Sequence, residues 1–234
     1  MIIITSSVPK SASTAIVRLI KELISHSDKR SAQNYMDSKR GNSFFKTINF
    51  TTFLYLVWLN LARGRFVIKT HCPPTAYIRI LISLGLAKAV FSYRDPRDVV
   101  LSAIDHGNRS RSNMEKIPSF KNITDTDRAL QYVTKELKKH DEWRDYHRAL
   151  FIRYEEFMND NRTVLSNLNH YLGLGTSKKK MDEILAKFES EKTTYHNYNT
   201  GLSNRYLTEM SEEDLKKCNE AFRDYLLKNN YPIA

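Results

Sequence analysis

Short apolar runs alternate with longer segments of helical spacing along most of this 234-residue chain. The runs are rich in β-branched and aromatic residues, which is typical of buried strands, and they lie at 1–4, 66–70, 88–93 and 149–154. Between them, apolar residues recur three and four positions apart, as on the core-facing side of a helix. Strands that alternate with helices form a parallel sheet covered by helices on both faces. The sequence therefore predicts one α/β domain over residues 1–234.

The remaining elements follow from capping and turn residues. Gly85 and Gly173 are placed to end helices, Pro96 suits the first turn of a helix, and Ser211 resembles the start of a capping box. We expect irregular segments at 28–43, 107–122 and 190–205. We expect helices over 44–62, 75–84 and 177–188, and from Thr124 or Asp125 to Tyr146. Three more helices are expected to begin at Ile16, Pro96 and Ser211, and another is expected to end at Leu172.

The charge balance limits the possible partners of the protein, and the cysteines limit its location in the cell. The formal net charge of +11 favours an anionic partner, which could be a nucleic acid, a membrane surface or a small molecule bearing phosphate or sulfate. Cys72 and Cys218 are far apart and have no metal-ligand spacing, so a reducing compartment is the simplest inference. No signal peptide is expected, and the longest apolar stretch, 53–59, is too short to cross a bilayer. We therefore expect a cytoplasmic protein with no membrane partner.

The first apolar run is followed by a polar turn, Pro9-Lys10-Ser11-Ala12-Ser13-Thr14, and then by a segment of helical spacing. A strand, a turn and a helix in this order direct free backbone N–H groups at an anion. The hydroxyl groups of Ser11, Ser13 and Thr14 add donors, and Lys10 adds a positive charge. An ordinary capped connection between strand and helix would look the same.

Two other strand ends carry candidate functional groups. The second strand closes with Lys69-Thr70-His71, where His71 could accept a proton near neutral pH or could simply bond to the backbone. The third closes with Tyr93-Arg94-Asp95-Pro96-Arg97-Asp98-Val99-Val100-Leu101-Ser102. Arg94 and Ser102 could grip one phosphate together, although Asp95 and Asp98 also suit a salt-bridged helix start. Ligands of parallel sheets bind at the carboxyl ends of the strands, where all these groups fall.

In this order, the three motifs resemble those of sulfotransferases that use 3′-phosphoadenosine 5′-phosphosulfate (PAPS). Arg153-Tyr154-Glu155-Glu156-Phe157 is similar to a downstream strand-end motif of that family, and Gly201-Leu202-Ser203-Asn204-Arg205-Tyr206 falls where the family has a Gly-rich cofactor segment. The resemblance covers nearly the whole chain. It implies a P-loop nucleotide-kinase-like sheet, PAPS as the donor, 3′-phosphoadenosine 5′-phosphate (PAP) as the product, and no metal.

The resemblance also implies roles for individual residues. His71 would be the general base, while Lys10 and Lys69 would stabilise charge at the leaving oxygen and the sulfuryl group. The residues that would bind the donor are Lys10, Ser11, Ala12, Ser13 and Thr14 at the 5′ end, Arg94 and Ser102 at the 3′-phosphate, Tyr154 near the adenine, and Gly201 and Ser203 in the C-terminal segment.

Two of the places where the sequence departs from the family pattern concern donor binding. Ala12 stands where the family usually has glycine, so we expect no positive φ there. Asn199-Thr200-Gly201 lacks the basic pair that often precedes that glycine, which leaves open how the 3′-phosphate is held.

Two other functions compete with sulfotransfer. A P-loop kinase requires Gly-x-x-x-x-Gly-Lys-Ser/Thr and Mg²⁺, but here Lys10 precedes the hydroxyl residues and the glycines are missing. A nucleic-acid-binding protein would suit the charge, but the sequence has no recognition motif, so we expect no nucleic-acid partner.

The acceptor is expected to be a small molecule, and whether it is an alcohol, phenol, amine or sugar stays open, as does the oligomeric state. Residues 35–60 and 105–122 are expected to line its pocket, with Asp37, Asp105 and His106 suited to a polar or cationic acceptor. The aromatic residues of the first range fit a core helix better than a pocket wall: Phe44, Phe45, Phe53, Tyr55 and Trp58.

Overall fold

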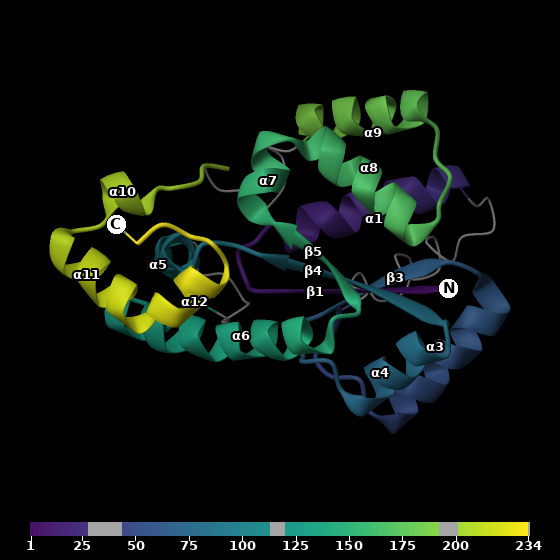
Figure 1. Cartoon of the computed structure of the whole chain (residues 1–234), viewed down its shortest axis with the longest axis horizontal. Helices are drawn as coiled ribbons and strands as arrows, with labels where there is room; N and C mark the ends of the chain where they lie inside the picture. Colours follow the sequence, from purple (N-terminus) through teal and green to yellow (C-terminus); the bar gives the residue numbers. More distant parts are fainter. Residues whose placement is uncertain (28–43, 113–119, 192–200, 234) are drawn as a thin grey trace.

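The computed structural model describes residues 1–27, 44–112, 120–191 and 201–233, and shows a five-stranded sheet at the centre of the molecule (Figure 1). All strand pairs are parallel and the order across the sheet is β2-β3-β1-β4-β5. The strands are β1 (Ile2–Ser7), β2 (Phe44–Phe45), β3 (Phe66–Thr70), β4 (Ala87–Tyr93) and β5 (Ala149–Arg153). The predicted parallel α/β sheet is confirmed, with β1 between β3 and β4.

Helices cover both faces of the sheet, as the sequence predicts (Figure 1). On one face α1 packs with α8 and α9, and on the other α3, α4, α5 and α6 pack with α11 and α12. The helices are α1 (Ser13–Ser27), α3 (Phe50–Arg63), α4 (Ala76–Ser83), α5 (Pro96–Ser112), α6 (Thr126–Tyr146), α7 (Tyr154–Asn159), α8 (Asn161–Leu172), α9 (Lys178–Glu191), α10 (Tyr206–Glu209), α11 (Glu212–Ala221) and α12 (Arg223–Lys228).

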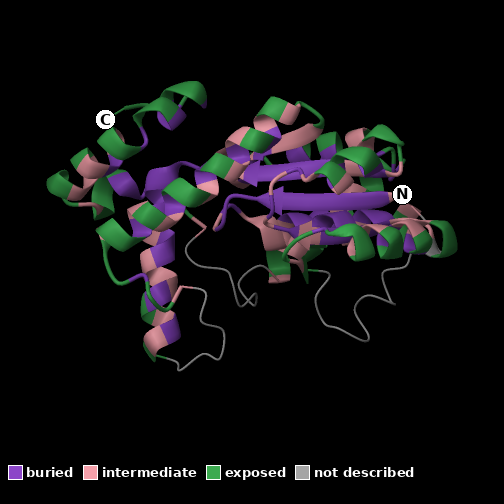
Figure 2. Ribbon diagram, turned by 90° about the horizontal axis from the view of Figure 1, so that it is seen from below, coloured by how far each residue is buried: buried purple, intermediate pink, exposed green. Residues whose placement is uncertain are grey.

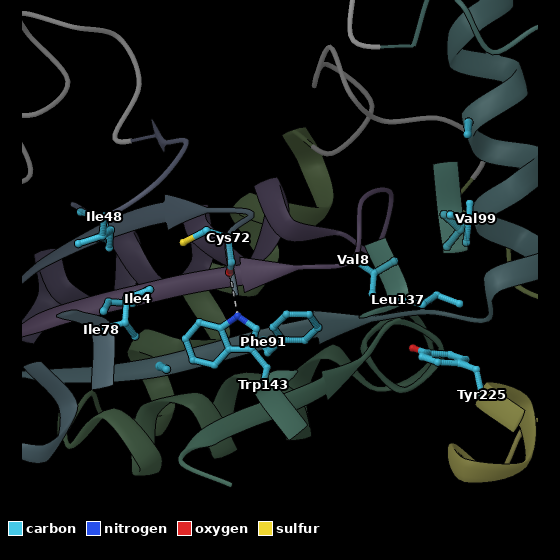
Figure 3. Packing of buried hydrophobic residues seen from close by; sticks show 14 of the residues in the cluster. Ile4, Val8, Ile48, Cys72, Ile78, Phe91, Val99, Leu137, Trp143 and Tyr225 are labelled. Atoms are coloured by element: carbon cyan, nitrogen blue, oxygen red, sulfur yellow. Dashed lines mark hydrogen bonds between the residues drawn. The ribbon is translucent and has the colours of Figure 1, made fainter. Parts of the chain in front are cut away.

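Two hydrophobic clusters hold the layers together. Because alternate residues of a strand face opposite sides of the sheet, Ile2 and Ile4 join one cluster and Ile3 joins the other. All six residues of β1 are buried, which explains its continuous apolar start, and the buried strands stand out in Figure 2. In the first cluster the indole N–H of Trp143 donates a hydrogen bond of 3.0 Å to the carbonyl oxygen of Cys72 (Figure 3).

The predicted helix over 44–62 is wrong at its beginning. Phe44 and Phe45 instead form β2, which pairs with Lys69 and Thr70 of β3. The helix begins only at Phe50, because the side chain of Asn49 accepts a hydrogen bond of 2.9 Å from the backbone N–H of Thr52 and caps it. A two-residue strand carries no periodicity of its own, so only its pairing with β3 identifies it.

The loop predicted over 107–122 is also wrong at its beginning, because α5 continues to Ser112. Gly107 lies inside this helix, and a Cβ atom there would be 2.3 Å from the carbonyl oxygen of Ile123. The glycine therefore permits a close approach of the backbone at Ile123 and does not end the helix. Residues 113–119 lie outside the described residues.

The predicted strand 149–154 and the helix after it have different boundaries in the structure. Tyr154 begins α7, and the single helix expected up to Leu172 is broken at Asp160, whose side chain accepts a hydrogen bond of 3.0 Å from the N–H of Thr163 and caps α8. Gly173 ends α8 with φ of 66°, as predicted.

The predicted start of the last helical region is confirmed, since Ser211 caps α11. Of the irregular stretch 190–205, α9 includes the first residues to Glu191, and 192–200 lie outside the described residues.

His140 of α6 is buried in this core between aromatic rings. Its ring centroid lies 5.0 Å from that of Phe91 and 4.9 Å from that of Tyr93, and its Nδ1 has no hydrogen-bond partner among the described residues. Burial, aided by the positive charges of Arg144 and Lys228, lowers the pKa of His140 to about 3. The folded protein therefore keeps this imidazole neutral in mildly acidic solution.

This lowered pKa makes stability depend on pH. The unfolded chain binds a proton at His140 below its ordinary pKa of about 6.5, whereas the folded protein binds it only near 3, so stability falls as the pH drops through this window. Between pH 7 and pH 5 we expect this residue to lower the free energy of unfolding by about 2 kcal/mol. Urea unfolding of the wild type and of His140→Phe at both pH values would measure it. The difference between the two pH values should shrink by that amount in the variant; an equal difference in both proteins would contradict the assignment.

Candidate functional site

The carboxyl ends of β1, β3 and β4 lie next to one another at one edge of the sheet. Because β1 pairs with β3 on one side and β4 on the other, the loop after β1 lies between Lys69-Thr70-His71 and Tyr93-Arg94. The structure thus brings together the three polar segments that the sequence places at strand ends. This edge is where open parallel sheets bind their ligands.

The loop after β1 has an unusual backbone. Lys10 and Ala12 both adopt left-handed conformations, with φ of 65° and 59°. The expectation of no positive φ at Ala12 is therefore wrong, because the turn needs this conformation with or without a glycine. The conformation costs an alanine on the order of 1 kcal/mol. Where right-handed and left-handed backbone conformations alternate, successive N–H groups point toward one place and form a concave anion-binding surface.

Hydrogen bonds hold this loop to the sheet and to α1. The N–H of Val8 donates to the carbonyl oxygen of Ser92 at 2.9 Å, and the N–H of Ile16 donates to the carbonyl oxygen of Ala12 at 3.0 Å. The hydroxyl of buried Ser11 donates back to the carbonyl oxygen of Val8. Ser11 therefore shapes the loop through its side chain, while Ser13 and Thr14 open the helix behind it.

Two lysine amines reach into this edge. Nζ of Lys69 lies 3.3 Å from Oγ1 of Thr14, and Nζ of Lys10 lies 3.3 Å from Nδ1 of His106. Burial lowers the pKa of both lysines to about 8, and for Lys10 the charges of Arg109 and Arg94 add to the effect. Both amines remain mostly protonated at neutral pH. A bound anion would relieve the unfavourable burial of the two charges.

His71 follows β3 and contacts Ser7 at the end of β1. Its Nδ1 lies 3.3 Å from both the hydroxyl and the carbonyl oxygen of Ser7. Because a carbonyl oxygen can only accept, the contact with it places the proton on Nδ1 and leaves a lone pair on Nε2. Burial, together with the charge of Lys69, lowers the pKa of His71 to about 4, so the ring is neutral at physiological pH. The ring centroid of Phe44 lies 5.4 Å away.

Arg94, at the end of β4, is buried and contacts residues of three other segments. Its Nη2 donates to Oδ2 of Asp98 at 3.0 Å and to the carbonyl oxygen of Leu202 at 2.6 Å. Its guanidinium carbon lies 4.0 Å from the ring centroid of Tyr154. Its Nε is buried and has no hydrogen-bond partner among the described residues. That unpaired donor suits an additional anionic oxygen.

Asp98 is a site residue whose reach the sequence does not reveal. Besides pairing with Arg94, its carboxylate accepts hydrogen bonds from the N–H groups of Asn204 at 2.9 Å and Tyr206 at 3.1 Å. The sequence predicts only the local role of an acidic residue in the first turn of a helix, because the partners lie more than a hundred positions away. Arg97, in contrast, pairs with Asp95 at 2.7 Å, which confirms the predicted salt-bridged helix start.

The other predicted site residues are placed as follows. Ser102 is buried on α5, the helix that follows Arg94, and Gly201 and Ser203 flank Leu202, whose carbonyl oxygen Arg94 meets. Asp105 forms an ion pair of 2.9 Å with Arg205, so its carboxylate is already engaged. His106, which the sequence analysis considers for acceptor binding, contacts Lys10 of the loop. The two residues are 96 positions apart, and the sequence gives no signal of this contact. Asp37, Asn199 and Thr200 lie outside the described residues.

Metal ligands and membrane-spanning helices were sought in the same part of the chain. Within residues 1–27, 44–112, 120–191 and 201–233, no three His, Cys, Asp or Glu side chains are grouped so that they could hold a metal ion. No helix among these residues is both long and apolar enough to cross a bilayer. Cys72 and Cys218 are separate, buried free thiols.

Comparison with known proteins identifies the family of this fold. The profile of the family described as "Sulfotransferase domain" matches residues 2–227. No curated protein sequence matches the chain. Among solved structures, a mouse sulfotransferase complexed with PAP aligns with a TM-score of 0.62 and 17% identity, over 97% of this chain and 84% of the other.

Two further structures support the same fold. A retinol dehydratase in complex with retinol and PAP aligns with a TM-score of 0.60 and 16% identity, over 96% of this chain and 81% of the other. A sulfotransferase from Mycobacterium avium aligns with a TM-score of 0.58 and 12% identity, over 99% of this chain and 77% of the other.

Proposed function

Because this chain belongs to the sulfotransferase domain family, we propose that it transfers a sulfuryl group from PAPS to a hydroxyl or amine of a small-molecule acceptor. One observation carries the proposal. A loop with two left-handed residues, two buried lysine amines and a neutral histidine lie together at one edge of the sheet. Phosphate and sulfuryl groups need the first two features, and acceptor activation needs the third.

The residues present fit an anionic nucleotide donor. The N–H groups of the loop around Lys10 and Ala12, with the hydroxyls of Ser13 and Thr14, would hold the 5′-phosphosulfate. Arg94, through its unpaired Nε, and Ser102 would hold the 3′-phosphate, with Tyr154 beside the adenine. Gly201 and Ser203 would complete this site through the segment that Arg94 and Asp98 bind.

The donor, when bound, supplies the sulfuryl group, and the protein supplies positioning and charge. Nε2 of neutral His71 would take the proton of the acceptor hydroxyl or amine, while Ser7 fixes the ring through Nδ1. The ammonium group of Lys10 would stabilise the negative charge on the oxygen that leaves toward the 5′-phosphate, and Lys69 would stabilise the sulfuryl oxygens. Charge stabilisation of this kind is the main device of phosphoryl transfer as well.

Calorimetric titration with PAP, 5′-AMP and ADP, each with and without Mg²⁺, would test the donor assignment. We expect tight, metal-independent binding of PAP and weak binding of 5′-AMP, which lacks the 3′-phosphate. Ser102→Ala should weaken PAP binding roughly tenfold or more, the usual effect of losing a hydrogen bond to a charged group. Ser110→Ala, the same change of a buried serine further along α5, is the matched control and should leave affinity unchanged. Mg²⁺-dependent binding of ADP in preference to PAP would contradict the assignment and favour a kinase.

A further inference from the structure

Helix α3 is apolar on both of its sides. One side is buried against the core through Leu56 and Leu59. The other side exposes a continuous set of large apolar residues at helical spacing, which we call the α3 apolar face: Phe50 (57% exposed), Leu54 (50%), Tyr55 (36%), Trp58 (53%) and Leu61 (79%). The expectation that Phe44, Tyr55 and Trp58 belong to the core is therefore wrong, while Phe45 and Phe53 do pack against it. Apolar surface gathered in this way marks an interaction site.

The neighbouring helix enlarges the exposed apolar surface of this corner. Helices α3 and α4 lie side by side below the sheet, at the far end of the molecule from the C terminus (Figure 1). On α4, Ile80 and Leu84 are 43% and 63% exposed. The α3 apolar face therefore lies on the outside of the molecule, on a corner built from α3 and α4.

The stretch of chain that builds this corner carries charges of a single sign. Residues 44–94 contain no Asp or Glu, although the whole chain has 26 of them. The same stretch contains several cations outside the site, among them Lys46, Arg65 and Arg79. A second copy of the chain that met this face with its own would bring these cations together, and residues 44–94 supply no carboxylate to pair them. An anionic partner with an apolar interior is complementary to both features.

We propose that the α3 apolar face binds the surface of a lipid bilayer that contains anionic lipids. Helix α3 would lie in the plane of the interface, with Leu54 and Leu61 entering the acyl region and Trp58 at the level of the headgroups, while exposed cations of this stretch, such as Lys46, contact lipid phosphates. With 14 residues, the helix is too short to span a bilayer, so the attachment is peripheral. The proposal departs from the sequence-based expectation of no membrane partner, and it does not depend on the reaction catalysed.

The two tryptophans allow a direct test. Trp58 is half exposed on the proposed contact face and Trp143 is fully buried, so a change in emission upon binding reports on Trp58. The full chain would be mixed with vesicles of phosphatidylcholine alone, or of two parts phosphatidylcholine to one part phosphatidylglycerol. We expect sedimentation with the anionic vesicles and a shift of emission to shorter wavelength, both weakened by salt and absent with phosphatidylcholine alone. The emission shift should disappear in Trp58→Phe while sedimentation persists.

A charge on the face should abolish the binding. The double variant Leu54→Glu/Leu61→Glu is expected to lower vesicle affinity at least about tenfold, because two side chains that would leave water become anionic. Leu227→Glu, at a leucine of α12 that is 56% exposed, is the matched control and should bind as the wild type does. No binding to anionic vesicles, or an equal loss in the control, would overturn the proposal. So would self-association of the wild type in gel filtration that the double variant abolishes, without vesicle binding, since that result would assign the face to a second copy.

Discussion

Turnover of the variant His71→Ala is expected to be lower than that of the wild type by roughly 10²-fold or more, the usual scale for the loss of a general base. PAP affinity should be unchanged, because the imidazole contacts Ser7 and Phe44 rather than the loop or the arginine proposed to hold the donor. Single-turnover kinetics with saturating PAPS, beside calorimetric titration with PAP, would separate the two effects.

The pH dependence of kcat/KM in the wild type is a second test of the role of His71. With the pKa of His71 lowered to about 4 by burial, the base is unprotonated throughout the neutral range, and kcat/KM should fall only as the pH approaches 4. With the pKa of Lys10 lowered to about 8, also by burial, the rate should fall again as the pH rises above 8. His170→Ala, at an exposed histidine of α8, is the matched control and should retain both turnover and the pH profile. Near-normal turnover of His71→Ala would remove this residue from the mechanism.

The variant Asp98→Ala is expected to lower the free energy of unfolding by about 3–5 kcal/mol, the range found when one partner of a buried ion pair is removed. The side chain of Asp98 is fully buried, and its loss leaves the guanidinium of Arg94 without its carboxylate and two backbone N–H groups, at Asn204 and Tyr206, without their acceptors. Urea unfolding followed by circular dichroism would measure the change.

Loss of Asp98 should also release one particular segment. The backbone of residues 202–206 is held to α5 by Asp98 and to the end of β4 by Arg94, so limited proteolysis should cut there sooner in the variant. Glu183→Ala, which breaks the exposed pair with Lys180, is the matched control and should unfold at the same urea concentration as the wild type. If Asp98→Ala did the same, the ion pair would not be what joins the C-terminal segment to the site.

The extent to which the sequence predicts this fold depends on how local each signal is. Four strands are predictable because their β-branched runs are local, and the ends of helices at Gly85 and Gly173 are predictable because αL caps favour glycine. The two-residue β2 is defined only by its pairing with β3, and the role of Gly107 only by the approach of Ile123. The apolar pattern of α3 identifies a helix but cannot tell which of its two apolar sides faces the core.

The same distinction applies to the candidate site. The strand-end motifs can be recognised because parallel strands bring their carboxyl ends together, and the structure places them accordingly. The left-handed backbone at Ala12 could not be predicted, because alanine disfavours it and the anchoring of the loop to Ser92 and α1 imposes it. Contacts between distant positions, such as Asp98 with Asn204 and Lys10 with His106, need the tertiary structure.

The central position of β1 has a consequence during synthesis on the ribosome. Ile2 pairs with Phe66 of β3 and with Ala87 of β4, so β1 is translated well before both of the strands that flank it in the sheet. At usual elongation rates of about 5–20 residues per second, the wait until β4 is complete lasts roughly 5–20 s. During that time three consecutive isoleucines remain available to other nascent chains or to a chaperone. We therefore expect the yield of this protein in a cell to respond to chaperone supply and to translation rate.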